Sequence, residues 1–160
     1  MDVRPLNGDD WQLKRDLRLA ALKDSPSAFA STYAREEHRS ELEWRDWPHP
    51  GAYFCAFGAG GVPLGIAGSW VSAAEPDITH LISMWVAPEA RGRRVAAALV
   101  DAVVGWAGEY GSAAVELEVA AGNDAAMTAY LRCGFAVTDR EPFTVGGTVL
   151  VRHLPGLSGR

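Results

Sequence analysis

Residues 84–99, MWVAPEARGRRVAAAL, join a strand to a helix, and this junction decides the fold. The apolar residues before Ala87 predict the end of a buried strand. Pro88 stops the strand, because proline cannot donate a ladder hydrogen bond. A helix is then expected from Gly92 to Glu109, since apolar residues recur there at helical spacing.

The start of this helix is predicted to bind an anion. Its first backbone N–H groups lack intrahelical partners and carry partial positive charge. Arg91, Arg93 and Arg94 crowd the same point, where the helix dipole disfavours cations, so a polyanion such as a pyrophosphate would neutralise them. Ala96 and Ala97 keep the first turn small. The turn lacks the Gly-Lys-Ser/Thr of a P-loop, and a solvated basic turn is the alternative interpretation.

A second informative stretch lies between Asn123 and Tyr130. These residues are seven positions apart, nearly two helical turns, so they share one helix face about 10 Å apart along the axis. A tyrosine hydroxyl has an ordinary pKa near 10, which suits it to protonate a departing thiolate. The alternative for Tyr130 is an aromatic side chain packed in the core beneath the sheet.

The rest of the chain alternates short apolar runs with helical patterns. Asp9 and Asp10 are expected to cap a helix that runs to Leu22, and Gly134 to cap another. Further helices are expected at 33–47 and 123–133, and strands at 52–59, 63–72, 77–86, 113–119, 135–139 and 145–153. This order predicts an α/β or α+β fold with a mixed sheet.

Length and composition narrow the class of protein. The 160 residues suit one domain spanning 1–160, and the net charge of −5 argues against generic nucleic-acid binding. Without a secretory leader or an apolar run long enough for a membrane span, a cytoplasmic protein is expected. Cys55 and Cys133 form no metal-binding or disulfide pattern, so no metal is expected.

Taken together, the two stretches resemble the GNAT superfamily of N-acetyltransferases over roughly residues 78–135. The pyrophosphate motif of that family, Gln/Arg-x-x-Gly-x-Gly/Ala, is matched by Arg91 to Ala96. Asn123, Tyr130 and the pair Gly134-Phe135 match a second hallmark. Arg94 departs from the pattern, because it stands where the family has glycine. Its N–H is expected to bind phosphate from a helical conformation.

The resemblance implies a mixed, mostly antiparallel sheet of six to seven strands, flanked by about four helices. Two parallel strands, ending at Val86 and Val119, would splay apart to form a cleft for acetyl-CoA. The pantetheine arm would bond to the backbone near Trp85 and Val86. The residues implied in cofactor binding are Trp85, Val86, Arg91, Gly92, Arg93, Arg94, Val95, Ala96, Ala97 and Asn123.

The resemblance also implies direct attack by an acceptor amine, with Tyr130 as the general acid. An amine with a pKa near 10.4 is almost entirely protonated at neutral pH, so a general base is useful. Glu118 and His80 are the two candidates, and the third alternative is that neither acts as the base. Aromatic residues near the expected acceptor loops, each also interpretable as core packing, are Phe29, Tyr33, Trp44, Trp47 and Phe143.

The leading prediction is therefore an acetyl-CoA-dependent N-acetyltransferase acting on a small-molecule or protein amine. A non-catalytic module that binds or senses acyl-CoA is the alternative, and a nucleotide-binding protein is a third class. Neither nucleic acid nor membrane is expected as a partner. A homodimer through the C-terminal strands is expected by family analogy alone.

Overall fold

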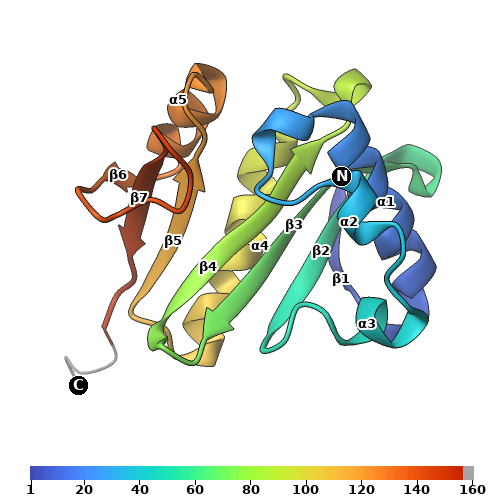
Figure 1. The fold of residues 1–160 in the computed structure, drawn as a ribbon, viewed down its shortest axis with the longest axis horizontal. Coiled ribbons are helices and arrows are strands. Elements are labelled where there is room, and N and C mark those ends of the chain that lie inside the picture. The colour runs from blue at the N-terminus through green and yellow to red at the C-terminus, as the bar shows by residue number, and fades with distance from the viewer. Residues whose placement is uncertain (157–160) are drawn as a thin grey trace.

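The strands lie side by side in one sheet in the computed structural model, which describes residues 1–156 (Figure 1). The order of the seven strands is β1-β2-β3-β4-β5-β7-β6. The strands are β1 (Asp2–Leu6), β2 (Gly51–Phe57), β3 (Pro63–Ser72), β4 (Glu75–Val86), β5 (Ala114–Val119), β6 (Ala136–Val137) and β7 (Thr148–His153). Only β4 and β5 pair in parallel, which confirms the expected mixed, mostly antiparallel sheet.

The described residues form five α-helices, against about four expected. They are α1 (Trp11–Asp24), α2 (Tyr33–Glu36), α3 (Glu41–Asp46), α4 (Val95–Tyr110) and α5 (Asp124–Arg132). Short 3-10 turns lie at η1 (Gly8–Asp10), η2 (Pro26–Ala28), η3 (Ala59–Gly61) and η4 (Pro88–Ala90). The expected helix at 33–47 is two helices, because Ser40 and Glu43 form a capping box that starts α3 afresh.

Two other differences concern the N-terminal region. Strand β1 was not expected; it pairs with β2 from Asp2 to Leu6 at the edge of the sheet. The side chain of Asp10 makes no cap to α1, whereas Asn7 caps the preceding turn η1 by accepting a hydrogen bond from the Asp9 N–H at 2.9 Å.

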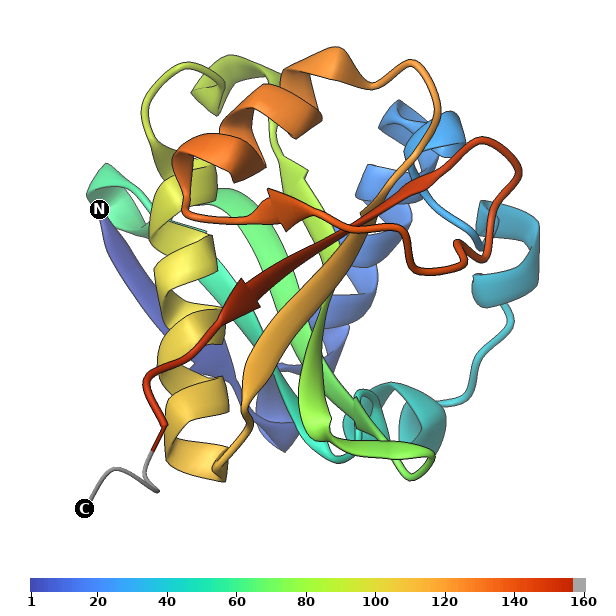
Figure 2. The same ribbon diagram turned by 90° about the vertical axis from the view of Figure 1, so that its left-hand side faces the viewer.

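The helices cover the two faces of the sheet (Figure 2). Helix α4 packs on β2, β3 and β4, and its buried residues join the larger apolar core. Gly65 on β3 leaves room for both β4 and α4, because a Cβ there would lie 2.7 Å from the Trp85 carbonyl oxygen of β4 and 3.2 Å from a Val95 methyl of α4. Helices α1, α2 and α3 lie on the opposite face. Within residues 1–156, none of the helices has both the length and the apolar character of a bilayer span.

Candidate functional site

Strands β4 and β5 part after a short parallel segment. Their pairing joins Ile78 to Ala114, Thr79 to Val115 and His80 to Glu116, and both strands continue beyond it. Figure 1 shows the two arrows diverging from this point toward the end of the sheet that carries α5. The edge of β4 from 81 to 86 therefore faces the gap without β5 paired to it. The splayed strand pair is confirmed, and an extended ligand could bond to this edge as an added strand.

A bulge bends β4 inside the diverging segment. Ile82 faces Gly68 while Trp85 faces Ile66, so β4 has one more residue than β3 between these pairs. Ser83 takes up the extra length with a left-handed φ of 60°. A bulge of this kind redirects the backbone and locally interrupts the ladder. It lies three residues before Val86, in the part of β4 that faces the gap.

The turn before α4 differs from its expected conformation. The helix begins at Val95 rather than Gly92, and Arg94 is its N-cap in the left-handed region, with φ 62° and ψ 22°. The expectation of a helical Arg94 was therefore wrong. Val95 is buried under the sheet and fixes where the helix starts, so the chain must reverse just before it. The first intrahelical bond runs from the Ala98 N–H to the Arg94 carbonyl at 3.2 Å. The N–H groups of 95–97 are thus available at the helix start.

The side chains of Arg91 and Arg93 point away from the start of α4. The Arg91 guanidinium donates to the Val86 carbonyl at 3.0 Å and to the Asp24 carboxylate at 2.7 Å. The Trp85 indole N–H donates to the same carboxylate at 3.0 Å. The Trp85 hydrogen bond, with those from Ser25 and Arg91, holds the pKa of Asp24 below its ordinary value. Asp24, at the end of α1, thus ties the turn before α4 to β4.

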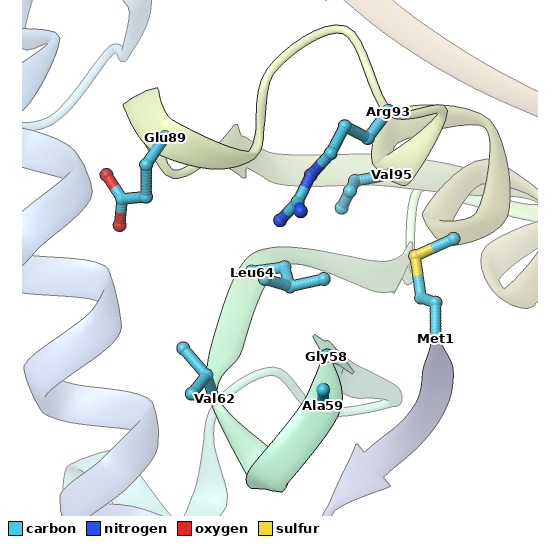
Figure 3. A pocket seen from close by; sticks show the side chains of 8 residues that line it. All are labelled: Met1, Gly58, Ala59, Val62, Leu64, Glu89, Arg93 and Val95. Carbon is cyan, nitrogen blue, oxygen red and sulfur yellow. The ribbon is translucent and has the colours of Figure 1, made fainter.

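Arg93 points into a hollow on the β2–β3 side of the turn, above Leu64 (Figure 3). This hollow has a volume of about 480 Å³ and is closed below by the hairpin between β2 and β3. Because Arg91 and Arg93 point away from the start of α4, anion binding by this turn would depend mainly on the backbone N–H groups there and on Arg94.

Tyr130 lies on α5 as expected, whereas Asn123 is the N-cap residue just before this helix, with a non-helical backbone. The Asn123 side chain caps the helix by accepting a hydrogen bond from the Ala126 N–H at 3.3 Å. Tyr130 is 9% exposed and packs edge-on against Phe135, with ring centroids 5.9 Å apart. Burial, with a smaller contribution from Cys133, raises the pKa of the Tyr130 hydroxyl above its ordinary value. Tyr130 therefore keeps its proton at neutral pH.

His80 and Glu116 stand where the two strands part. Alternation places Leu81 and Leu117 in the core under α4, so His80 and Glu116 face the side of α1–α3. The His80 ring also lies beside that of Trp70 of β3, tilted by 40° with ring centroids 5.6 Å apart. One row across the sheet thus holds an aromatic ring, an imidazole and a carboxylate.

Glu118 lies two residues further along β5 on the same face, and the segment between β6 and β7 holds it in place. Its carboxylate accepts hydrogen bonds from the N–H groups of Phe143 at 2.7 Å and Thr144 at 2.9 Å, and from the Thr144 hydroxyl. Burial acts to raise the pKa of Glu118, but these hydrogen bonds outweigh it and lower the pKa overall. Glu118 is consequently a weak proton acceptor while this segment is in place.

The aromatic residues expected near the acceptor differ in exposure. Trp44 is fully buried and so packs in the core, which was the alternative for it. Phe29 and Trp47 are partly buried, and the Arg18 guanidinium lies 4.9 Å and 5.7 Å from their ring centroids. Phe143 is 97% exposed and Tyr33 is 40% exposed, so both are open to a partner molecule.

The structure adds residues that the sequence pattern did not single out. These residues are Glu116, Arg140, Asp24 and Ser83. The alternation of β5 placed Glu116 beside Glu118, which was a usable signal. The contact of Arg140 with Glu75 and that of Asp24 with Trp85 join residues more than 60 positions apart and leave no local pattern.

Comparisons with known proteins agree with this architecture. A family model described as the acetyltransferase (GNAT) family matches residues 19–135. A mycothiol acetyltransferase of Pseudarthrobacter chlorophenolicus is 30% identical over 145 residues, which cover 88% of this chain and 44% of that protein. The chain thus spans less than half the length of that relative.

Two solved structures share the fold. A phosphinothricin acetyltransferase of Sinorhizobium meliloti, in complex with AcCoA, matches with a TM-score of 0.76 at 17% identity over 98% of this chain and 90% of that chain. A GCN5-related N-acetyltransferase of Kribbella flavida matches with a TM-score of 0.75 at 24% identity, over 96% of this chain and 97% of that chain.

Proposed function

The chain belongs to the GNAT family of acetyltransferases, and on this premise we propose that it transfers an acetyl group from acetyl-CoA to a primary amine. The observation that carries the proposal is the parting of β4 and β5 next to the free helix start at Val95. This arrangement offers two features at one end of the sheet. The extended backbone edge suits the pantetheine arm of acetyl-CoA, and the anion site suits its pyrophosphate.

Acetyl-CoA would bind with its pyrophosphate on the N–H groups of 95–97, assisted by Arg94. The pantetheine arm would follow the free edge of β4 past Trp85 and Val86. Asn123, whose side chain caps α5, would line the β5 side. The thioester would then lie toward the point where the strands meet, near His80 and Glu116, and a backbone N–H in the bulged part of β4 would stabilise the oxyanion.

In the reaction, the amine nitrogen attacks the thioester carbonyl carbon and forms a tetrahedral intermediate. The carbon–sulfur bond then breaks, and the sulfur takes a proton from the Tyr130 hydroxyl. The attacking nitrogen gives up its own proton to a base. We favour His80 as that base, because the hydrogen bonds from 143 and 144 lower the pKa of Glu118 and occupy its oxygens. Glu118 is the alternative if this segment opens when the acceptor binds.

Thiol release from acetyl-CoA across a panel of amines tests the proposal. Tyr130→Phe removes only the hydroxyl and should lower kcat by about 10²- to 10⁴-fold with little change in the KM of acetyl-CoA. An unchanged kcat would remove Tyr130 from the mechanism. The pH profile of kcat/KM for His80→Ala and Glu118→Gln identifies the base, since only the variant lacking it loses the wild-type profile.

A module that binds acyl-CoA without turnover is the second candidate. The departure from glycine at Arg94, where the backbone is left-handed, favours the binding module, whereas the tyrosine retained at position 130 favours catalysis. Calorimetric binding of acetyl-CoA without thiol release for any amine would select the binding module. Competition by CoA but not by ATP would exclude a general nucleotide site.

A further inference from the structure

Arg140, from the segment between β6 and β7, bridges Glu75 at the start of β4 and Glu116 on β5, which pairs with His80 in the last row before the two strands part. Its Nη2 donates to the Glu75 carboxylate at 2.6 Å, and its Nε lies 2.9 Å from Oε2 of Glu116. The Glu116 side chain is 10% exposed, whereas those of Glu75 and Arg140 are 39% and 43% exposed. A half-exposed cation therefore rests on a buried carboxylate beside His80.

The fit between Arg140 and Glu116 is imperfect. Oε2 of Glu116 is buried, yet no hydrogen bond with acceptable geometry reaches it from the described residues. In the same molecule, Arg18 and Glu36 form a two-point pair, with Nε and Nη2 each 2.9 Å from a separate carboxylate oxygen. Such a fork is the geometry that a guanidinium prefers on one carboxylate. Arg140 instead divides its donors between two carboxylates.

The charges around this point do not balance. Two carboxylates, Glu75 and Glu116, face one guanidinium, and Glu118 adds a further carboxylate on the same face of β5. The Trp70 ring lies beside His80 and is 38% exposed, so its face can contact a cation. Besides the Arg140 guanidinium, the surroundings of His80 therefore favour binding of another cation over a neutral or negative group.

We propose that Glu116 and Glu75 form a cation subsite for the acceptor and that Arg140 occupies it until the acceptor displaces it. The acceptor class is an amine with a second cationic group, such as a diamine. This inference rests on the proposed function, since it assigns the substrate class of the same site. One nitrogen binds Glu116 as an ammonium ion, and the other, neutral after deprotonation, faces the thioester in the gap between β4 and β5.

The test compares 1,4-diaminobutane with 1-aminobutane, which differ only in the second amine. The ratio of their kcat/KM values is measured by thiol release. Arg140→Gln should raise the preference for the diamine about three- to fivefold. The guanidinium would no longer compete with the ammonium ion for the two carboxylates, and an exposed ion pair contributes about this much. Glu116→Gln should lower it about tenfold, and Glu75→Gln should lower it less because Glu75 is more exposed.

Glu141→Gln is the matched control, because it removes one carboxylate from an exposed residue next to Arg140 and should leave the ratio unchanged. Thermal unfolding of each variant shows whether it is folded. A ratio that Arg140→Gln leaves unchanged, or that Glu116→Gln does not lower, would overturn the subsite and make Arg140 a loop anchor.

Calorimetry separates failure of the subsite from failure of the proposed function. Titration of 1,4-diaminobutane into the protein with CoA present should show binding that Glu116→Gln weakens and 1-aminobutane lacks. If this binding occurs without thiol release, the subsite stands and the transferase proposal falls. If amines are acetylated without any preference for the diamine, the transferase proposal stands and the subsite falls.

Discussion

Replacing Arg94 by glycine should stabilise the fold, because Arg94 adopts a left-handed backbone conformation with φ 62° and ψ 22°. A side chain with a Cβ costs roughly 1–2 kcal/mol in that region. Glycine removes this cost but gains freedom in the unfolded chain, which costs roughly 0.4–1 kcal/mol. The balance is about 1 kcal/mol in favour of Arg94→Gly.

This free energy corresponds to a measurable shift in Tm. An unfolding entropy of about 2.1 cal/mol/K per residue gives roughly 0.34 kcal/mol/K for 160 residues, so 1 kcal/mol is about 3 °C. Arg94→Ala removes the same charge but keeps the Cβ, so its Tm should stay within about 1 °C of the wild type. Arg93→Gly, at a neighbouring position without a positive φ, should lower Tm by about 1–3 °C.

Differential scanning calorimetry of the three variants without ligand is the assay. The comparison of Arg94→Gly with Arg94→Ala isolates the backbone, because both remove the guanidinium. Equal Tm values for these two variants would refute the reasoning and show that position 94 is not strained. A gain in Tm for Arg93→Gly as well would show that loss of positive charge, rather than backbone relief, explains the effect.

Three further predictions concern contacts that position the site. Gly65→Ala should destabilise the protein by about 1–3 kcal/mol in urea unfolding, because the new Cβ would lie 2.7 Å from the Trp85 carbonyl oxygen; an unchanged midpoint would contradict this. Glu36→Gln should lower the free energy of unfolding by about 3–5 kcal/mol, because it leaves Arg18 buried without its carboxylate. Burial acts to raise the pKa of Glu36, but hydrogen bonds and charge from Arg18 lower it overall. The difference in unfolding free energy between the wild type and Glu36→Gln should therefore be full above the ordinary pKa of 4.5. It should decrease as the pH falls through the folded-state pKa. Asp24→Asn should shift the indole N–H resonance of Trp85 in NMR spectra, assigned with Trp85→Phe, while Asp16→Asn on the same helix should not.

The sequence alone determined the elements that depend on local pattern. The strand ending at Val86, the helix before Gly111 and the helix carrying Tyr130 follow from apolar spacing, because burial of one face requires a regular period. The cap at Gly134 was also readable, since its φ of 90° favours glycine. The family resemblance rested on residues within these elements and their junctions, Arg91 to Ala96 and Asn123 to Phe135.

Tertiary structure decided how the site residues are held. The left-handed Arg94 results from the burial of Val95 under the sheet, which a linear pattern of residues does not reveal. Glu118 is tied to Thr144 and Arg140 to Glu75 across separations of 26 and 65 residues. Such contacts depend on which strands become neighbours and on how the closing segment crosses the sheet. Helices and strands depend on the spacing of residues that are close in the sequence, so the sequence alone predicts them. Ion pairs between distant residues form only when the fold brings those residues together.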